Sequence, residues 1–317
     1  MQNKANRLLF HMSSSHTLSA SRTHRSLSIL RLLTPVMNRS SLTSPPYWRK
    51  QHLELGQYAC TKRGFSSMSL DKHGSNIREE HGDLLDRLKR LDTALLCDAD
   101  KSLFGPLPAT NNAEGSESSR LRLMNQDIKS LNKNQTEKVS STMVGWARTV
   151  QCTTPNDFLA VLRGLTESQQ GEVLVVNTMG STRAVAGGLF ATEASHHNRQ
   201  LAGIIIDGPM RDIASLSHSL PCYASFVTPY SGTTQSPGQM QTRIKCGGVI
   251  VNPGDIIVGD EDGIVAASVE ALQSIIDQAE AIQRVEQDLM NGMVQGGGSL
   301  ASMSNFHEHL EKRISRE

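Results

Sequence analysis

The chain has 317 residues, which is enough for one large domain or two smaller ones with a substantial buried core. Its formal net charge of +1 conceals an uneven distribution. Residues 1–70 hold ten Lys and Arg against one acid, so the remaining 247 residues hold 22 basic and 30 acidic side chains. That body lacks the basic surface that grips phosphate backbones, so nucleic acid is excluded as a partner. No apolar run approaches the roughly 18 residues that cross a bilayer, so no membrane association is expected.

Residues 1–65 have the composition of an organelle presequence, because they are rich in Ser and Arg and nearly free of acids. The sequence KRGFSSMS at residues 62–69 resembles a mitochondrial cleavage site, with the cut after Phe65. We therefore expect a disordered presequence that is removed, and a protein of the mitochondrial matrix. A plastid or cytoplasmic location, and a Ser-rich tail that is merely disordered, are the alternatives that the sequence leaves open.

Residues 76–317 are expected to form one α/β domain. Apolar residues at helical spacing predict a helix over residues 76–93, and a short apolar segment follows it. Residues 106–140 are polar and rich in Asn, Ser and Lys, which indicates a surface insertion or long loop. Because neither side of this segment looks complete alone, it is not taken as a domain boundary.

Beyond residue 142, strands and helices alternate and then give way to a block of short strands. We expect strands over residues 143–152, 171–177, 201–207 and 222–227. Helices are expected between them, over residues 155–165, within 180–197 and over 212–220. Short strands follow within residues 240–267, then a long amphipathic helix over 268–291 and a short charged helix over 304–315. This order predicts a sheet that is parallel at first and mixed later.

The cysteines and histidines carry no metal or disulfide signature. The five cysteines form no CxxC pair and are odd in number, so the four in the domain are expected to be buried, reduced thiols. His196 and His197 are neighbours that cannot share a helix face, and we expect exposed residues rather than metal ligands. No P-loop, serine-hydrolase elbow or HExxH motif occurs, and GGGS at 296–299 follows a helix rather than a strand, which excludes a dinucleotide loop.

The sequence IIIDGPMRD at residues 204–212 is the strongest candidate for a reaction centre. A buried strand is expected to run into an Asp-Gly turn and then into Arg211 and Asp212. Ligands of α/β sheets collect beyond the carboxyl ends of the strands. A carboxylate suits a magnesium-type cation, while a guanidinium stays charged and binds a carboxylate or an enolate. The alternative is structural: Asp212 caps the next helix and Arg211 is a surface charge.

A pair of glycines in AVAGGLFATEA, residues 184–194, provides a second feature. Glycine is used where the backbone approaches something closely or begins a helix. The amides of Gly187, Gly188, Leu189 and Phe190 could point at an anion, as helix N-termini do. Together with a cation and a metal-binding carboxylate, such amides describe a site for a small 2-keto acid. Tight packing of helix against strand is the alternative explanation of the glycines.

Three stretches together resemble a known family: GEVLVVNTMGSTRAVAGGLFATEA, LAGIIIDGPMRD and CGGVIVNPGDIIVGDEDGIV. They resemble the family shared by the A-like regulators of ribonuclease E activity and the class II 4-hydroxy-4-methyl-2-oxoglutarate aldolases, some of which decarboxylate oxaloacetate. The resemblance covers about residues 76–314, apart from the insertion. It implies a swivelling β/β/α sandwich with a mixed central sheet and a C-terminal helix. It also implies a homotrimer or a hexamer with sites between subunits.

The resemblance also implies roles for individual residues. Asp212 would bind Mg²⁺ or Mn²⁺, Arg211 would hold the pyruvyl group, and the amides of residues 187–190 would receive its carboxylate. One position departs from the pattern, because enzymes of the family carry an acid where this chain has Gly188. Glu193, or an acid of a neighbouring subunit, is the candidate substitute. Glu286 is the candidate for the carboxylate that the family lends to metal-bound water from a neighbouring C-terminal helix.

The expected function is that of a divalent-metal-dependent lyase acting on a small 2-keto acid. The reaction is decarboxylation of oxaloacetate, retro-aldol cleavage of substrates like 4-hydroxy-4-methyl-2-oxoglutarate to pyruvate, or both. The missing acid at residue 188 favours decarboxylation, which needs only an electron sink at the ketone. The alternative is a non-catalytic regulatory or binding member of the family that acts through its oligomer surface. The presence of Asp212 favours the enzyme, since the resembling regulators can lack that aspartate.

Overall fold

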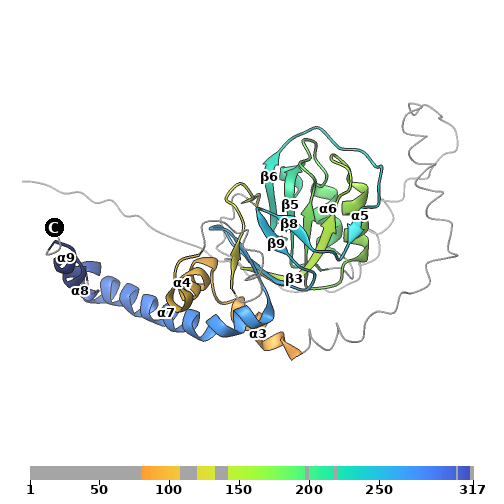
Figure 1. Cartoon of the computed structure of the whole chain (residues 1–317). Helices are drawn as coiled ribbons and strands as arrows, with labels where there is room; N and C mark the ends of the chain where they lie inside the picture. Colours follow the sequence, from red (N-terminus) through yellow and green to blue (C-terminus); the bar gives the residue numbers. More distant parts are fainter. Residues whose placement is uncertain are drawn as a thin grey trace, which may run out of the picture. The chain divides into compact units, whose positions relative to one another are not determined.

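The computed structural model describes residues 80–107, 120–132, 142–196, 200–216, 220–304 and 306–314 (Figure 1). Its contacts separate residues 1–69 from residues 70–317, and every described residue belongs to the second unit. The presequence expected over residues 1–65 lies outside the described residues, so its removal and its destination stay predictions.

A mixed sheet forms the centre of the described unit, in the order β1-β11-β10-β3-β4-β5-β6-β2, with β7 paired to β3. Strands β3, β4, β5 and β6 are parallel to one another, whereas β10 pairs antiparallel with both β3 and β11. The expectation of a sheet that is parallel at first and mixed later is confirmed. The strands are β1 (Arg122–Leu123), β2 (Lys129–Ser130), β3 (Met143–Gln151), β4 (Glu172–Asn177), β5 (Gly203–Met210), β6 (Cys222–Val227), β7 (Gln239–Met240), β10 (Ile256–Gly259) and β11 (Ile264–Ala267).

The two faces of the sheet are covered by different layers, which makes the predicted β/β/α sandwich (Figure 1). Leu174 and Ile206 point to the face covered by two helices, while Val173 and Ile205 point to the face covered by a small hairpin. Because both faces are buried, β4 and β5 are continuous apolar runs instead of alternating ones. The outer layers are helices α5 (Leu159–Glu167) and α6 (Gly188–Ser195), and strands β8 (Ile244–Cys246) and β9 (Val249–Val251).

A separate apolar cluster joins the first and last helices to β3, β10 and β11. In the described residues the helix expected over residues 76–93 is the shorter α3 (Gly82–Leu88), and the apolar segment that follows it forms a second helix, α4 (Thr93–Phe104). They divide at Asp92, whose Oδ1 accepts the N–H of Leu95 at 2.8 Å and thereby caps α4. The apolar segment expected after residue 93 is therefore helical.

Helix α7 (Val269–Gly296) is buried only along its first half. The Ser268 hydroxyl accepts the N–H of Ala271 at 3.3 Å and caps the helix. Its second half carries exposed apolar side chains, and the short helices α8 (Leu300–Met303) and α9 (Phe306–Ile314) follow. The buried residues are Ala271, Leu272, Ile275, Ile276 and Ala279. None of the helices that the structure describes is both long and apolar enough to span a membrane.

Residues 120–132 differ from the surface loop that was expected for them. They add β1 and β2 to the two edges of the sheet and bury four apolar side chains: Leu121, Met124, Ile128 and Leu131. These side chains are spaced irregularly among polar ones, so no periodic pattern marks them in the sequence. The remainder of the expected insertion, residues 108–119 and 133–140, lies outside the described residues.

Candidate active site

The carboxyl ends of β3, β4, β5 and β6 meet at one edge of the sheet, because these four strands are parallel. The expectation of an Asp-Gly turn inside IIIDGPMRD is wrong, because Asp207 and Gly208 lie within strand β5. Strand β5 continues to Met210, and after a register shift it pairs again with β6 through Pro209 opposite Phe226 and Met210 opposite Val227. Arg211 and Asp212 therefore lie directly beyond the end of β5, at the edge where ligands of such sheets bind.

Arg211 and Asp212 form a loose, partly exposed pair. Arg211 Nε lies 3.4 Å from Asp212 Oδ2, and the two side chains are 40% and 50% exposed. Exposed ion pairs contribute little stability, so both groups can exchange this contact for a ligand. Asp212 has a φ of 55°, and a non-glycine residue in this region costs of order 1–3 kcal/mol and is characteristic of functional sites.

The structural alternative for Asp212 is not supported by the geometry. Its side chain makes no capping hydrogen bond. The helix expected over residues 212–220 is reduced to one 3₁₀ turn, η1 (Ile213–Ser215), and residues 217–219 lie outside the described residues. Asp212 therefore adopts a strained backbone conformation without the helix cap that would have explained it.

The glycine pair brings the start of α6 against Arg211. A Cβ on Gly187 would lie 3.0 Å from both Cγ and the carbonyl oxygen of Arg211, so glycine permits this approach. The N–H of Arg211 donates to the carbonyl of Ala186 at 3.1 Å. Within the described residues, no acceptor takes the N–H groups of Gly188, Leu189 and Phe190, as at the start of a helix in general. Free amides, a guanidinium and a carboxylate are thus gathered at one place.

The side chains of Leu189 and Phe190 have different surroundings. Leu189 is 80% exposed. Phe190 packs edge-on against Phe158, with ring centres 6.3 Å apart, and thereby anchors α6 to the start of α5. Both residues were predicted to act through their amides, and neither side chain interferes with that role.

Gly188 occupies the position where an acid was expected by resemblance, and the space around it is filled. A Cβ at residue 188 would lie 2.7 Å from Cβ of Ser215 and 3.4 Å from Cβ of Asp212. A carboxylate could therefore enter only if η1 moved. Ser215 and Asp212 thus occupy the space that an acidic side chain at residue 188 would need.

The two other predicted acids lie on exposed helical surfaces. Glu193 is exposed in the second turn of α6, about 7.5 Å along the helix axis from Gly188. Glu286 is exposed in the half of α7 that extends beyond the apolar cluster. Both acids remain predictions as site residues.

The donor set at this edge suits a hard cation that keeps most of its water. Over the described ranges no three His, Cys, Asp or Glu side chains gather into a closed metal site. Mg²⁺ usually takes only one or two protein carboxylates, with waters and substrate oxygens completing its shell. Asp212, half-exposed and oxygen-donating, fits such an ion in chemistry.

The thiols in the described residues are free, as expected, and not suited to nucleophilic catalysis. Cys152, Cys222 and Cys246 are buried and Cys97 is half-buried. Burial raises the pKa of Cys152 and of Cys222 to about 12 and the pKa of Cys97 to about 11. The thiolate is the reactive form, so these side chains stay inert near neutral pH. His196 is exposed, as expected, whereas His197 lies outside the described residues.

Two residues that sequence reasoning read only as a helix start hold the loops of this edge together. Asp157 is 1% exposed, and its carboxylate accepts the N–H groups of Gln235 and Ser236 as well as that of Leu159. Asn156 has a φ of 63°, and its Oδ1 accepts the N–H of Arg183 at 2.9 Å. The Pro-Asn-Asp sequence itself is recognisable as a helix-capping signal. The residues that Asn156 and Asp157 bind in other loops are distant in the sequence, so no local sequence pattern predicts these contacts.

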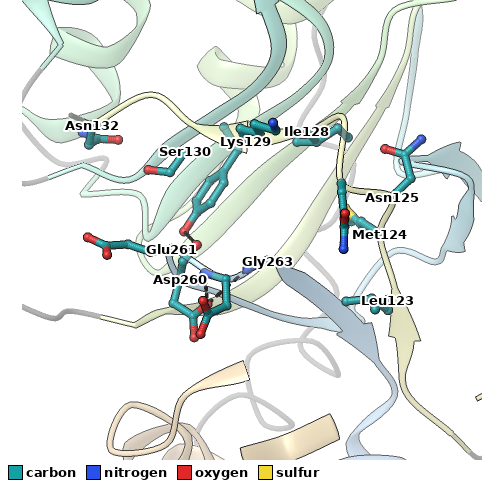
Figure 2. Close-up of a pocket in the computed structure, with 13 residues that line it drawn as sticks. Leu123, Met124, Asn125, Ile128, Lys129, Ser130, Asn132, Asp260, Glu261 and Gly263 are labelled. Atoms are coloured by element: carbon teal, nitrogen blue, oxygen red, sulfur yellow. Dashed lines mark hydrogen bonds between the residues drawn. The ribbon is translucent and has the colours of Figure 1, made fainter. Parts of the chain in front are cut away.

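A cavity of about 540 Å³ lies elsewhere, at the amino ends of the parallel strands (Figure 2). Figure 2 shows Asp260, Glu261 and Gly263 facing residues 123–132 across it. The Asp260 carboxylate accepts the N–H and the hydroxyl of Thr93 at 2.6 and 2.7 Å, so it serves to attach α4 to the β10–β11 turn. This cavity is thus separate from the group around Arg211.

Comparison with known proteins agrees with the sequence resemblance. The profile of the family described as "RraA-like: Aldolase/RraA" matches residues 93–266. A protein of Halalkalibacterium halodurans with the provisional name 4-hydroxy-4-methyl-2-oxoglutarate aldolase is 35% identical over 158 residues, covering 49% of this chain and 71% of the relative. A protein of Shewanella oneidensis with the same provisional name is 38% identical over 129 residues, covering 40% and 77%.

Solved structures share the architecture. RraAS2 of Streptomyces coelicolor, titled an unusual member of the RNase ES inhibitor RraA protein family, has a TM-score of 0.50 at 27% identity, covering 65% of this chain and 94% of the other. An uncharacterized protein from Pseudomonas syringae pv. tomato has a TM-score of 0.54 at 22% identity, covering 70% and 96%, which shows likeness of fold. Since the profile spans more than half of the chain, and the relative of Halalkalibacterium is matched over 71% of its length, this protein belongs to the RraA-like family.

Proposed function

We propose that the protein is a divalent-metal-dependent lyase that cleaves a carbon–carbon bond in a small 2-keto acid. The observation that supports this most directly is the meeting of the α6 amides, Arg211 and Asp212 at the carboxyl edge of the sheet. Relatives with the provisional name of aldolase make a lyase the expected class.

In this proposal each group has one task. The free amides at the start of α6 bind the 1-carboxylate of the substrate, as helix N-termini bind anions. Arg211 holds its guanidinium near the ketone oxygen, where negative charge grows as the bond breaks. Asp212 holds Mg²⁺ or Mn²⁺, and a cation there supplies Lewis-acid polarisation of the ketone. The carboxylate of Asp212 lies 3.4 Å from Arg211 Nε, so both groups stand at the same place on the edge of the sheet.

Oxaloacetate decarboxylation is the reaction that these residues suit better. The bond between C3 and C4 breaks, its electron pair forms the enolate of pyruvate, C4 leaves as CO₂, and C3 takes a proton from water. This reaction removes no proton from the substrate, so it needs no carboxylate of the protein as a base. Retro-aldol cleavage of 4-hydroxy-4-methyl-2-oxoglutarate-type substrates also yields pyruvate, but its hydroxyl must lose a proton. Gly188 supplies no base for that step, so Glu193 or a neighbouring subunit's acid would have to serve.

A non-catalytic regulatory role is the second candidate, and Gly188 is the observation that favours it. The RraAS2 structure is titled as a member of an inhibitor family, so the fold alone does not require catalysis. Such a protein would have no need to keep the strained Asp212 beside Arg211.

Pyruvate formation from oxaloacetate tests the proposal. The full chain with Mg²⁺ is expected to exceed the background of Mg²⁺ alone, and EDTA is expected to abolish the excess. Asp212→Ala and Arg211→Ala should each lower kcat/KM by on the order of 10²–10³, the usual cost of one preorganised contact. Asp262→Ala is the matched control, because that exposed acid lies in the turn beside the distant cavity. If wild type and Asp212→Ala both match the metal background, the regulatory role is favoured instead.

We also propose that the protein assembles as a homotrimer or hexamer. Large apolar side chains near the candidate site are exposed in the isolated chain: Met179, Leu189, Phe226, Val227 and Tyr230. Apolar surface of this kind is typical of a face covered by another subunit. In that assembly Glu286 would act in a neighbouring subunit's site. A monomeric mass by light scattering at micromolar concentration would contradict this assembly.

A further inference from the structure

The cavity at the amino ends of the parallel strands lies where the two edges of the sheet approach each other (Figure 2). Strands β1 and β2 stand at opposite ends of the strand order, yet only residues 124–128 separate them in the chain. So short a segment spans at most about 20 Å. The Tyr223 hydroxyl on β6 donates to the carbonyl of Asp260, which follows β10, at 3.0 Å. The cavity is therefore a product of the curled sheet.

Backbone hydrogen bonds fix the wall formed by residues 123–132. At one end the N–H of Met124 donates to the carbonyl of Ile264 at 2.9 Å. At the other end the N–H of Leu131 donates to the carbonyl of Cys222 at 2.8 Å. A segment that is bonded to the sheet at both of its ends keeps its place without a ligand, so the cavity is formed before anything binds.

The cavity has an apolar floor and a charged rim. Lys129 belongs to β2 on one wall, and Glu261 and Asp262 belong to the turn between β10 and β11 on the other (Figure 2). A buried apolar floor with a few polar groups, and a volume of about 540 Å³, are usual for a site that binds a small molecule. The floor consists of side chains that are at most 4% exposed: Met124, Ile128 and Tyr223.

The charged groups on the rim do not neutralise one another. In the part of the chain that the structure describes, the side chains of Lys129, Glu261 and Asp262 make no hydrogen bond and no ion pair. Opposite charges that line one cavity without meeting are held apart by the walls that carry them. A ligand with a single charge would be attracted by one wall and repelled by the other, whereas a ligand with both charges suits both walls.

We infer that this cavity binds a small zwitterion whose carboxylate and ammonium groups are separated by an apolar chain, such as an ω-amino acid. The carboxylate pairs with Lys129, and the ammonium group pairs with Glu261 and Asp262. The chain between them lies on the apolar floor and loses its contact with water.

The inference does not depend on the proposed lyase activity. Strand β6 begins beside the cavity at Tyr223 and ends at Val227, which pairs with Met210 just before Arg211. Six residues of strand span about 20 Å, so a ligand in the cavity does not touch the candidate active site.

Three probes of equal chain length test the inference by calorimetry on the full chain: 6-aminohexanoate, hexylamine and hexanoate. The first carries both charges, and each of the others lacks one. We expect 6-aminohexanoate to bind about 5-fold more tightly than either, since an exposed ion pair contributes up to about that factor. This preference should shrink as the salt concentration rises, because exposed charges are screened.

Charge-removing variants assign the two ends of the ligand. Lys129→Met should bind 6-aminohexanoate no better than hexylamine, because the carboxylate has lost its partner. Glu261→Gln/Asp262→Asn should bind it no better than hexanoate. Lys101→Met removes an exposed lysine of α4, and this matched control should keep both preferences. All of these side chains are exposed, so the Tm of each variant should equal that of wild type.

Methyl NMR locates the bound probe. The δ-methyl resonance of Ile128 should shift on addition of 6-aminohexanoate, and that of Ile275, buried beneath α7, should not. Equal binding of the three probes, an unchanged preference in Lys129→Met, or an unmoved Ile128 resonance would overturn the inference. Pyruvate formation is a separate measurement, so a protein that binds the zwitterion and cleaves no keto acid would sink the lyase proposal alone.

Discussion

Residue 188 shows how an absent side chain shapes the proposed chemistry. The space beside Gly188 is occupied by Ser215, whose Cβ would meet an added Cβ at 2.7 Å. Restoring an acid there would therefore displace η1 and, with it, the backbone that presents Asp212. The residue at position 188 is therefore coupled to Ser215 through packing, and a change at one position acts on the other.

Gly188→Asp is expected to lower the free energy of unfolding by about 1–3 kcal/mol, the usual cost of overpacking. An aspartate at the start of a helix is otherwise favourable, so the clash with Ser215 is the cause of the loss. Urea unfolding followed by circular dichroism measures it. The double variant Gly188→Asp/Ser215→Gly should recover at least half of the lost stability, with Ser215→Gly as its reference. Equal stability of Gly188→Asp and wild type would contradict the packing argument.

Cys222 makes stability depend on pH in the alkaline range. Burial alone raises the pKa of its thiol to about 12, compared with about 8.5 in an unfolded chain. The protonated thiol therefore stabilises the fold fully below the unfolded pKa, and this contribution is lost as the pH rises toward 12. Between pH 8 and pH 10.5 the fall in Tm should be smaller for Cys222→Ala than for wild type. An equal fall in both proteins would show that other groups dominate.

At the scale of elements, α7 divides into a part that stabilises the domain and a part that does not. Ile275 is 1% exposed among the residues that α7 packs against α4 and the sheet. Val285, farther along the same helix, is 58% exposed. Only the first half of the helix therefore contributes to the core of this chain.

Ile275→Ala should destabilise the protein by about 2–5 kcal/mol, whereas Val285→Ala should change its stability by less than about 0.5 kcal/mol. Both changes shorten a β-branched side chain to alanine on one helix, so helix propensity changes little between them. Chemical denaturation of the two variants measures the difference. A large loss in Val285→Ala would instead place that residue in an interface between subunits, where stability depends on protein concentration.

The elements that the sequence predicts well are those with a strong local pattern. Strands β4 and β5 are apolar runs of a length that suits a buried parallel sheet, and α7 follows its N-cap Ser268 with regular apolar spacing. Helix α4 was missed because its cap, Asp92, stands inside a longer helical pattern. Strands β1 and β2 are two residues each, too short for any periodicity to show.

The candidate site was predictable only where its residues belong to a strong local sequence pattern. Arg211, Asp212 and the glycine pair stand in stretches whose order along the chain already implies the carboxyl edge of the sheet. Lys129 and Glu261 stand far apart in the sequence, and only the folding of the sheet brings them to one cavity. The filling of the space at Gly188 by Ser215 is likewise a property of the tertiary structure.

At the scale of the whole molecule, the excess of positive charge lies in the N-terminal segment, since residues 1–70 hold ten Lys and Arg against one acid. If residues 1–65 are removed on import, as we propose, the mature protein begins at Ser66 and carries a net charge of about −8 with His neutral. N-terminal sequencing of protein isolated from mitochondria should find a start between residues 60 and 72. An intact Met1, or a start far outside that range, would contradict the proposal, and isoelectric focusing should show the matching acidic shift.

The apolar cluster between the first and last helices has a consequence for how the chain is made. Arg87 on α3 pairs with Glu280 on α7, 193 positions farther along the chain, at 2.8 Å. At a synthesis rate of about 5–20 residues per second, α7 emerges roughly 10–40 s after α3. Throughout that interval the apolar face of β3, β10 and β11 lacks its last covering helix. A ribosome that stops before α7 therefore releases an aggregation-prone chain, and not a domain that merely lacks one helix.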